Sequence, residues 1–282
     1  MNGVMRGLAA WCLTMTMAAG TSGELIEYGD LEGDAVMYRE ITENSLTEEE
    51  GSPSEGLGVY GEPSLNGDVL NFNVPSFFAL ATGASMTDVA DGLLTFGLEP
   101  LPEYGMALTR LAMLEFGSVS LFTPFGGTAA ANVESPFFLS VTKVLLNDGS
   151  NFGLEVDLAQ PIIVQSSLTL MPNNFGGGWN SNDDPGVISW IGEASINLVD
   201  EMLAADPTLD DQFPLVGVTR MQVSMSNTLT AAVDTPLATA MVDKSHVEFR
   251  PTLAVVPEPR SLALLGLSLL GLVCFRGKET PA

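Results

Sequence analysis

Short apolar stretches that alternate with polar residues are the feature that most constrains the middle of this chain. Leu154, Val156 and Leu158 alternate with acidic residues, and the same period recurs over residues 221–226 and 246–250. A period of two places one side of a β-strand in a core and the other side in water. Gly, Pro, Asn and Asp separate these stretches, as in chains built from many strands. The pattern therefore predicts an all-β fold.

Turn and helix signals complete this prediction. Asp148-Gly149 is a turn pair that joins antiparallel strands. Helical signals are few: residues 198–205 predict one short helix, and a turn is expected near Asp88. We expect an antiparallel β-sandwich over residues 67–255, of which a jelly roll is one arrangement.

The amino end has the order of a secretory signal peptide. Arg6 precedes an apolar stretch at residues 8–19, and small residues follow it. About a dozen apolar residues fall short of the roughly 20 that a transmembrane helix needs. We expect residues 1–23 to form a signal helix that signal peptidase removes by cutting between Ala19 and Gly23. An uncleaved anchor or a buried first helix is the alternative.

The carboxyl end combines a proline-rich motif, an apolar run at residues 261–275 and a short basic tail. Proline restricts its own backbone and that of the preceding residue, so the motif is expected to be stiff and extended. Fifteen helical residues span roughly 22 Å, less than the ~30 Å hydrocarbon core, which suits temporary retention. The basic tail is expected to stay in the cytoplasm, which leaves the body outside. The motif residues are Val256, Pro257, Glu258 and Pro259, and the basic residues are Arg276 and Lys278.

This tail resembles the PEP-CTERM sorting domain of exported proteins of Gram-negative bacteria. The resemblance covers about residues 256–278, with Arg260 standing where a small residue is usual. It implies a sorting signal over residues 256–282, with a hydrophobic helix that an exosortase removes near the Pro-Glu-Pro motif. It also implies association with exopolysaccharide, a biofilm matrix or the cell surface. An ordinary carboxyl-terminal membrane anchor is the alternative.

Charge and cysteine content exclude several classes of protein. The chain has 10 Lys+Arg against 35 Asp+Glu, a formal net charge of −25, so it lacks the basic surface that nucleic-acid binding requires. Cys12 and Cys274 lie in the two terminal signals, so the processed chain is expected to contain no thiol. Residues 24–66 form an acidic leader, expected to be solvated and partly disordered, with an edge strand at residues 36–38. A diffuse contact with cations or matrix is the functional alternative for the leader.

The body carries few signs of catalysis. His246 is the only histidine, and alternation places it on a polar strand face between Lys244 and Glu248. A Ser-His-Asp triad would need it, and the sequence contains no Gly-x-Ser-x-Gly elbow. Carboxylate pairs are too numerous for sequence alone to select one as a hydrolase site. We therefore predict a protein that is not an enzyme.

The most distinctive internal stretch is a glycine-rich loop at residues 175–186. Its aromatic ring could stack on a sugar, and its amide and carboxylate oxygens are of the kind that calcium binds. The spacing departs from an EF-hand, so no metal site is assigned. A polar hairpin loop with its tryptophan folded back on the sheet is the simpler interpretation, and residues 206–211 are read as a similar turn. The candidate ligand residues are Trp179, Asn180, Asn182, Asp183 and Asp184.

Two functional hypotheses follow. The first is a non-enzymatic protein of the cell envelope or exopolysaccharide matrix, tethered briefly to the inner membrane and then trimmed to reach the cell surface. Its partners would be signal peptidase, exosortase and exopolysaccharide, with no nucleic acid and no cofactor. The second is a β-sandwich module that binds carbohydrate with the help of calcium.

Overall fold

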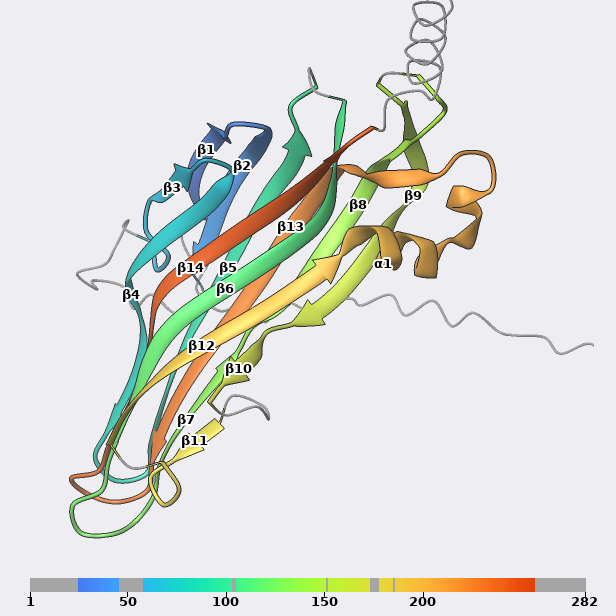
Figure 1. Ribbon diagram of the computed structural model, residues 1–282. Helices are drawn as coiled ribbons and strands as arrows, with labels where there is room; N and C mark the ends of the chain where they lie inside the picture. Colours follow the sequence, from blue (N-terminus) through green and yellow to red (C-terminus); the bar gives the residue numbers. More distant parts are fainter. Residues whose placement is uncertain are drawn as a thin grey trace, which may run out of the picture.

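The computed structural model describes residues 25–45, 58–102, 105–150, 152–172, 178–184 and 186–256. These residues form fourteen strands, one α-helix and a short 3-10 helix, drawn in Figure 1. The elements are β1 (Leu25–Glu32), β2 (Val36–Ser45), β3 (Pro63–Asn66), β4 (Val69–Thr82), β5 (Met86–Pro100), β6 (Met106–Phe122), β7 (Ala129–Glu134), β8 (Pro136–Leu146), β9 (Leu154–Ser167), β10 (Thr169–Met171), β11 (Gly178–Asn180), β12 (Gly186–Asn197), α1 (Leu198–Ala205), η2 (Pro207–Asp210), β13 (Leu215–Val233) and β14 (Thr239–Val255).

The strands form two facing antiparallel sheets. In the first sheet, β1, β2, β5 and β13 follow one another, and the other edge of β13 pairs with β8 and β7, which carry β9 and β11. In the second sheet the order is β3-β4-β14-β6-β12-β10. A single pair, Val218 with Leu108, joins β13 to β6 and connects the two sheets. This arrangement confirms the predicted antiparallel β-sandwich, and the jelly-roll arrangement stays a prediction.

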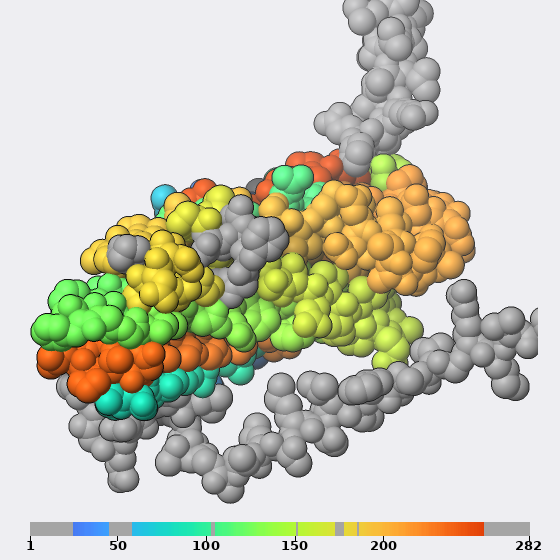
Figure 2. All heavy atoms as spheres, turned by 90° about the horizontal axis from the view of Figure 1, so that it is seen from below, coloured from blue at the N-terminus to red at the C-terminus, as the bar shows by residue number. Residues whose placement is uncertain are grey.

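The sandwich is elongated, with its strands along the long axis (Figure 1). Seen from below, α1 and η2 (orange) lie at one end and the loop between β6 and β7 (green) at the other (Figure 2). None of the helices within the described ranges is long and apolar enough to cross a membrane. The predicted signal helix and the predicted sorting helix lie outside these ranges.

The period of two explains which side chains enter the core. In β13, Met221, Val223 and Met225 are buried, whereas the residues between them are more exposed. In β9, Val156 is half-buried between exposed acidic neighbours, but Leu154 is 41% exposed. This strand therefore contributes less to the core than β13 does. The alternation read from the sequence therefore identifies the buried face correctly, and most completely in the central strand.

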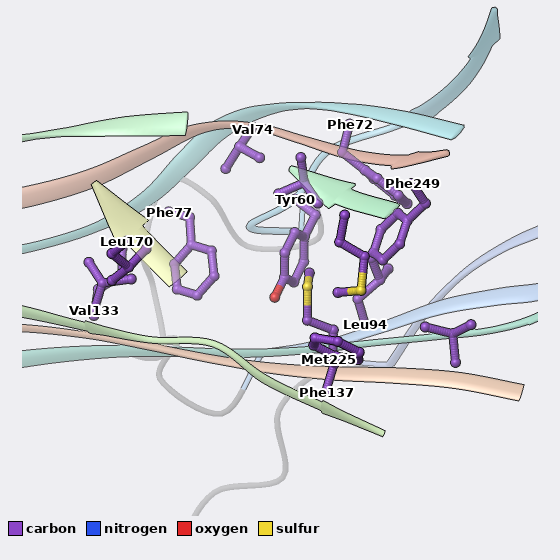
Figure 3. Close-up of a cluster of buried hydrophobic side chains, with 14 of the residues drawn as sticks. Tyr60, Phe72, Val74, Phe77, Leu94, Val133, Phe137, Leu170, Met225 and Phe249 are labelled. Carbon is purple, nitrogen blue, oxygen red and sulfur yellow. The ribbon is translucent and has the colours of Figure 1, made fainter. Parts of the chain in front are cut away.

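Aromatic rings fill the space between the sheets. Phe96 of β5 and Phe249 of β14 meet edge to face across the two layers, with ring centroids 4.8 Å apart. Tyr60 lies between the layers beside Phe77, at 5.3 Å, and near Phe72 (Figure 3). Such pairs add about 0.5–1.5 kcal/mol each beyond the burial of their surface.

A bulge in β14 reverses the alternation between Lys244 and His246. Val242 and Lys244 face the core, Ser245 is the extra residue, and Val247 resumes the buried face. The prediction that Lys244 shares the polar face of His246 is therefore wrong: Lys244 is 2% exposed. A β-bulge places two residues opposite one, so side chains beyond it change faces.

The acidic segment before the body contributes two strands to the first sheet. β2 pairs with β5 and buries Val36, Tyr38 and Ile41, and β1 covers its outer edge. Asp68 holds the turn between β1 and β2, because its Oδ1 accepts hydrogen bonds from the backbone of Ala35 (2.7 Å) and Val36 (3.2 Å). Residues 25–45 thus pack into the sandwich.

Two local predictions had different outcomes. Helix α1 spans Leu198–Ala205 as predicted, and the Asn197 side chain caps its first turn by accepting from the Asp200 backbone. The helical turn expected near Asp88 does not form: the chain makes a tight turn at residues 83–85, and Asp88 itself lies inside β5 and pairs with Ala231 of β13. Thirteen consecutive register pairs between β5 and β13 make this one of the longest regular ladders in the fold.

Trp190 of β12 lies against a glycine on the neighbouring strand. Gly117 of β6 is its register partner, and a Cβ added there would stand 2.5 Å from the indole and closer still to the Asp243 carbonyl. No real Cβ fits at that distance, so only glycine lets the large ring enter the core beside β6.

We predict that Gly117→Ala lowers the free energy of unfolding by about 1–3 kcal/mol, because the added methyl overpacks the core. Denaturant unfolding measures this change. Gly178→Ala is the matched control, since its nearest atom would be 3.8 Å away. Equal stability of the two variants would contradict the proposed packing.

Candidate functional site

The junction between the body and the predicted sorting motif is packed and hydrogen-bonded. Strand β14 ends at Val255, and the next residue, Val256, is 3% exposed and packs with Ala107 and Leu145. Its backbone N–H donates to the Gly105 carbonyl at 3.1 Å. The sandwich is therefore packed up to the first residue of the motif. The other predicted sorting residues lie outside the described residues: Pro257, Glu258, Pro259, Arg276 and Lys278.

The structure brings the candidate ligand residues together in one turn. The side chain of Asn180 accepts a hydrogen bond from the Asn182 backbone at 2.9 Å and donates one to Asp183 Oδ2 at 2.7 Å. The Asn180 carbonyl also accepts from the Asp184 backbone at 2.8 Å. Several of the oxygens that were considered as calcium ligands therefore stabilise the turn itself.

Trp179 points away from that turn into the core. It is 2% exposed on β11, and its ring lies 6.4 Å from that of Trp190. A ring buried on this scale offers no open face on which a sugar could stack. The position agrees with the interpretation in which the tryptophan folds back on the sheet.

We predict that Trp179→Ala destabilises the protein by about 3–5 kcal/mol, the usual cost of removing a large core ring. Asn182→Ala, an exposed change two residues beyond the strand, should alter stability by no more than about 0.5 kcal/mol. Denaturant unfolding of both variants provides the comparison. A Trp179→Ala protein as stable as the parent would show that the ring is not part of the core.

The histidine and the second polar turn have structural partners. His246 lies on the outer face of β14, where its Nε2 is 2.9 Å from Glu248 Oε1, and Arg250 donates to the other oxygen of Glu248 at 2.7 Å. Asp206 caps η2 by accepting from the Thr208 backbone at 3.0 Å. Within the described ranges, no group of three or more His, Cys, Asp or Glu side chains is placed to hold a metal ion.

A surface pocket of ≈ 340 Å³ gathers three cations of this acidic chain: Arg39, Lys143 and Arg220. Glu99 lies between two of them and bonds Arg39 Nε at 2.7 Å and Arg220 Nε at 3.1 Å. Partial burial by itself would raise the pKa of the Glu99 carboxyl group. The two guanidinium groups outweigh this effect, so the pKa of Glu99 is lowered. The sequence did not indicate this pocket, because its residues come from six different strands and the segments between them.

A second group of polar residues that the sequence did not indicate lies buried inside the sandwich. Lys244 Nζ is 2.7 Å from Glu115 Oε1, and the side chains of both are fully buried. Lys244 Nζ also donates to Asn227 Oδ1, so β14 reaches across to β13 of the other sheet. The Ser135 hydroxyl is in hydrogen-bonding contact with Glu115 Oε2 (2.8 Å) and with Asn227 Oδ1.

Aromatic side chains enclose this polar core cluster, which we define as Glu115, Ser135, Asn227 and Lys244. The Lys244 ammonium lies over the Phe77 ring, 5.4 Å from its centroid. Tyr60 OH accepts from Asn227 Nδ2 at 2.5 Å and donates to the Gly92 carbonyl at 3.2 Å. The cluster is thus closed to solvent, and each of its members has at least one polar partner within it.

Burial changes the protonation of this cluster. Removal from water lowers the pKa of Lys244 to about 8, although the nearby Glu115 carboxylate acts in the opposite direction. Burial also raises the pKa of Tyr60 well above its ordinary value. The lysine therefore has ready access to its neutral amine form near neutral pH, whereas the tyrosine keeps its proton.

The fold and the junction define an antiparallel β-sandwich joined directly to a carboxyl-terminal signal. Residues 255–278 match the PEP-CTERM protein-sorting motif, which confirms the resemblance read from the sequence. This motif supports an exported protein that is an exosortase substrate.

Other comparisons add little. Comparison with curated proteins finds no significant match. Among solved structures, TmCBM61 in complex with β-1,4-galactotriose is 11% identical, with 80% of this chain and 87% of that chain covered and a TM-score of 0.19. The infectious bursal disease virus Gt strain structure is 9% identical, with 85% and 57% covered and a TM-score of 0.12. TM-scores this low do not indicate a shared fold.

Proposed function

We propose that this protein is a non-enzymatic component of the cell envelope or exopolysaccharide matrix of a Gram-negative bacterium. The observation that carries the proposal is the sorting motif at residues 255–278, attached without a spacer to the packed sandwich at Val256. Signal peptidase would release the amino end. The inner membrane would hold the precursor until the exosortase trims it.

The surface chemistry suits a matrix protein. The net charge is −25, and four surface cations are already paired with carboxylates: Arg39, Lys143, Arg220 and Arg250. The many remaining carboxylates would attract divalent cations diffusely and keep the protein soluble. In this proposal the protein associates with acidic polysaccharide through shared cations.

The loop at Asn180 supports this proposal better than the carbohydrate-binding alternative. Trp179 is buried, and the loop uses its own oxygens to form a turn. Calcium-assisted sugar binding by this loop stays a prediction, and no contact described above favours it. We therefore propose only the matrix function.

The sorting step is tested by mass spectrometry of the protein from its native host. We expect the surface-exposed chain to end near Pro257 and to lack Lys278. A variant in which Pro257, Glu258 and Pro259 are all alanine should keep Lys278 and remain in the membrane fraction. Glu193→Gln on β12, an exposed acidic residue, serves as the control and should be processed normally.

An intact Lys278 in the surface-exposed pool of the parent protein would contradict exosortase processing. It would support a simple membrane anchor instead.

If shared cations join the acidic protein surface to acidic polysaccharide, binding should be weak and sensitive to salt. Titration calorimetry with calcium and an acidic polysaccharide should show weak association that added salt screens. Asp183→Asn should leave this association unchanged, because the charge is spread over the whole surface. Saturable binding that Asp183→Asn abolishes would instead support the carbohydrate-binding module. Asp183→Asn suits this test better than Trp179→Ala, since the latter also removes a core side chain.

A further inference from the structure

We infer that Lys244 and Asn227 become joined by an intramolecular isopeptide bond, formed with Glu115 as the catalytic proton carrier. The bond would link β14 to β13 and so fasten the two sheets of the sandwich to each other. The inference rests on the polar core cluster and is independent of the proposed function.

The reacting atoms are already in contact. Lys244 Nζ is hydrogen-bonded to Asn227 Oδ1. A nitrogen that contacts a carbonyl oxygen in this way lies about 3–3.5 Å from the carbonyl carbon, which is the separation of a near-attack arrangement. Neither side chain can leave this arrangement easily, because both are buried in the sandwich core.

Glu115 occupies the position that a proton carrier needs. Its Oε1 is 2.7 Å from Lys244 Nζ, and the Ser135 hydroxyl bridges its other oxygen to the Asn227 carboxamide. The carboxylate therefore touches the attacking nitrogen and lies one hydroxyl away from the amide. An amine attacks only in its neutral form, and burial lowers the pKa of Lys244 to about 8, which favours that form.

The steps balance in atoms and charge. A proton passes from the Lys244 ammonium to the Glu115 carboxylate, and the freed electron pair on Nζ forms a bond to Cγ of Asn227. Glu115 then gives its proton to Nδ2 and takes another from Nζ. The Cγ–Nδ2 bond breaks with its electron pair on nitrogen. Ammonia leaves, Glu115 keeps one proton, and no oxidant or cofactor is consumed.

The reaction would also remove an unfavourable feature of the core. An ammonium and a carboxylate held out of water carry a desolvation cost that their attraction repays only partly. The product has a neutral amide and a neutral carboxyl group in the same place. Tyr60 OH, which contacts Asn227 Nδ2 at 2.5 Å, keeps its proton because burial raises its pKa, so it adds no charge.

A plain buried ion pair is the competing explanation. It accounts for the contact between Lys244 and Glu115, but not for a carboxamide held against both groups by Ser135. The two explanations differ in one directly measurable quantity, the mass of the chain.

The test uses the purified protein from its host, with both chain ends established by peptide mapping and after incubation at mildly alkaline pH. We expect an intact mass below the calculated one by the mass of one ammonia molecule. Digestion before aspartate should leave residues 211–233, which contain Asn227, joined to the peptide that begins at Asp243. An unchanged mass with two separate peptides would overturn the inference.

Variants assign the roles. Lys244→Arg should show the full calculated mass, because a guanidinium stays protonated and does not attack. Glu115→Gln should also show the full mass, and Asn227→Asp should lose one water molecule in place of ammonia. Lys143→Arg on β8 is the matched control and should keep the ammonia loss. If a core variant fails to fold, the mass and the joined peptides of the parent protein still decide the question.

Discussion

Burial of the inward faces of two antiparallel sheets is the interaction on which the rest of this structure depends. Among the described residues the sheets share one register pair, Val218 with Leu108, so side-chain packing and the hydrogen bonds of the polar core cluster, rather than a backbone ladder, hold them together. Phe96 and Phe249 meet across this space, and Trp190 fits because Gly117 has no side chain. The polar core cluster lies inside the same layer. Its exclusion from water gives it strong electrostatic interactions, a lysine with lowered pKa and little freedom to move.

The surface and the interior of the protein differ in their content of charged side chains. The surface has a large excess of carboxylates and keeps several of its cations in ion pairs, as the matrix function proposed above requires. The interior has one ion pair, Lys244 with Glu115, among the described residues with fully buried side chains. Cys12 and Cys274 both lie in the predicted terminal signals, so the processed chain is expected to contain no disulfide. An amide cross-link would supply a covalent connection between the sheets that does not depend on the redox state of the surroundings.

Much of the fold could be predicted from local patterns. The alternation at Met221, Val223 and Met225 identified a central strand, and residues 198–205 form the expected helix. Asp88 shows the limit of such reasoning, because a residue common in turns lies near the start of β5, where pairing with β13 outweighs its preference. The candidate sites divide in the same way. The sorting motif is contiguous and was recognised directly, whereas the polar core cluster combines residues from positions 115 to 244, which only the folded chain brings together.

The sequence by itself determined that the chain is rich in strands, acidic, poor in cysteine and marked by a sorting motif at its end, because each of these properties is local or compositional. Only the tertiary structure decided which way Lys244 and Trp179 point. A single extra residue at Ser245 shifts the pairing of β14, and a strand that slips by one residue presents its side chains to the opposite face. The physical environment of the lysine, and with it the chemistry available to it, therefore comes from strand register, which depends on contacts between segments far apart in the chain.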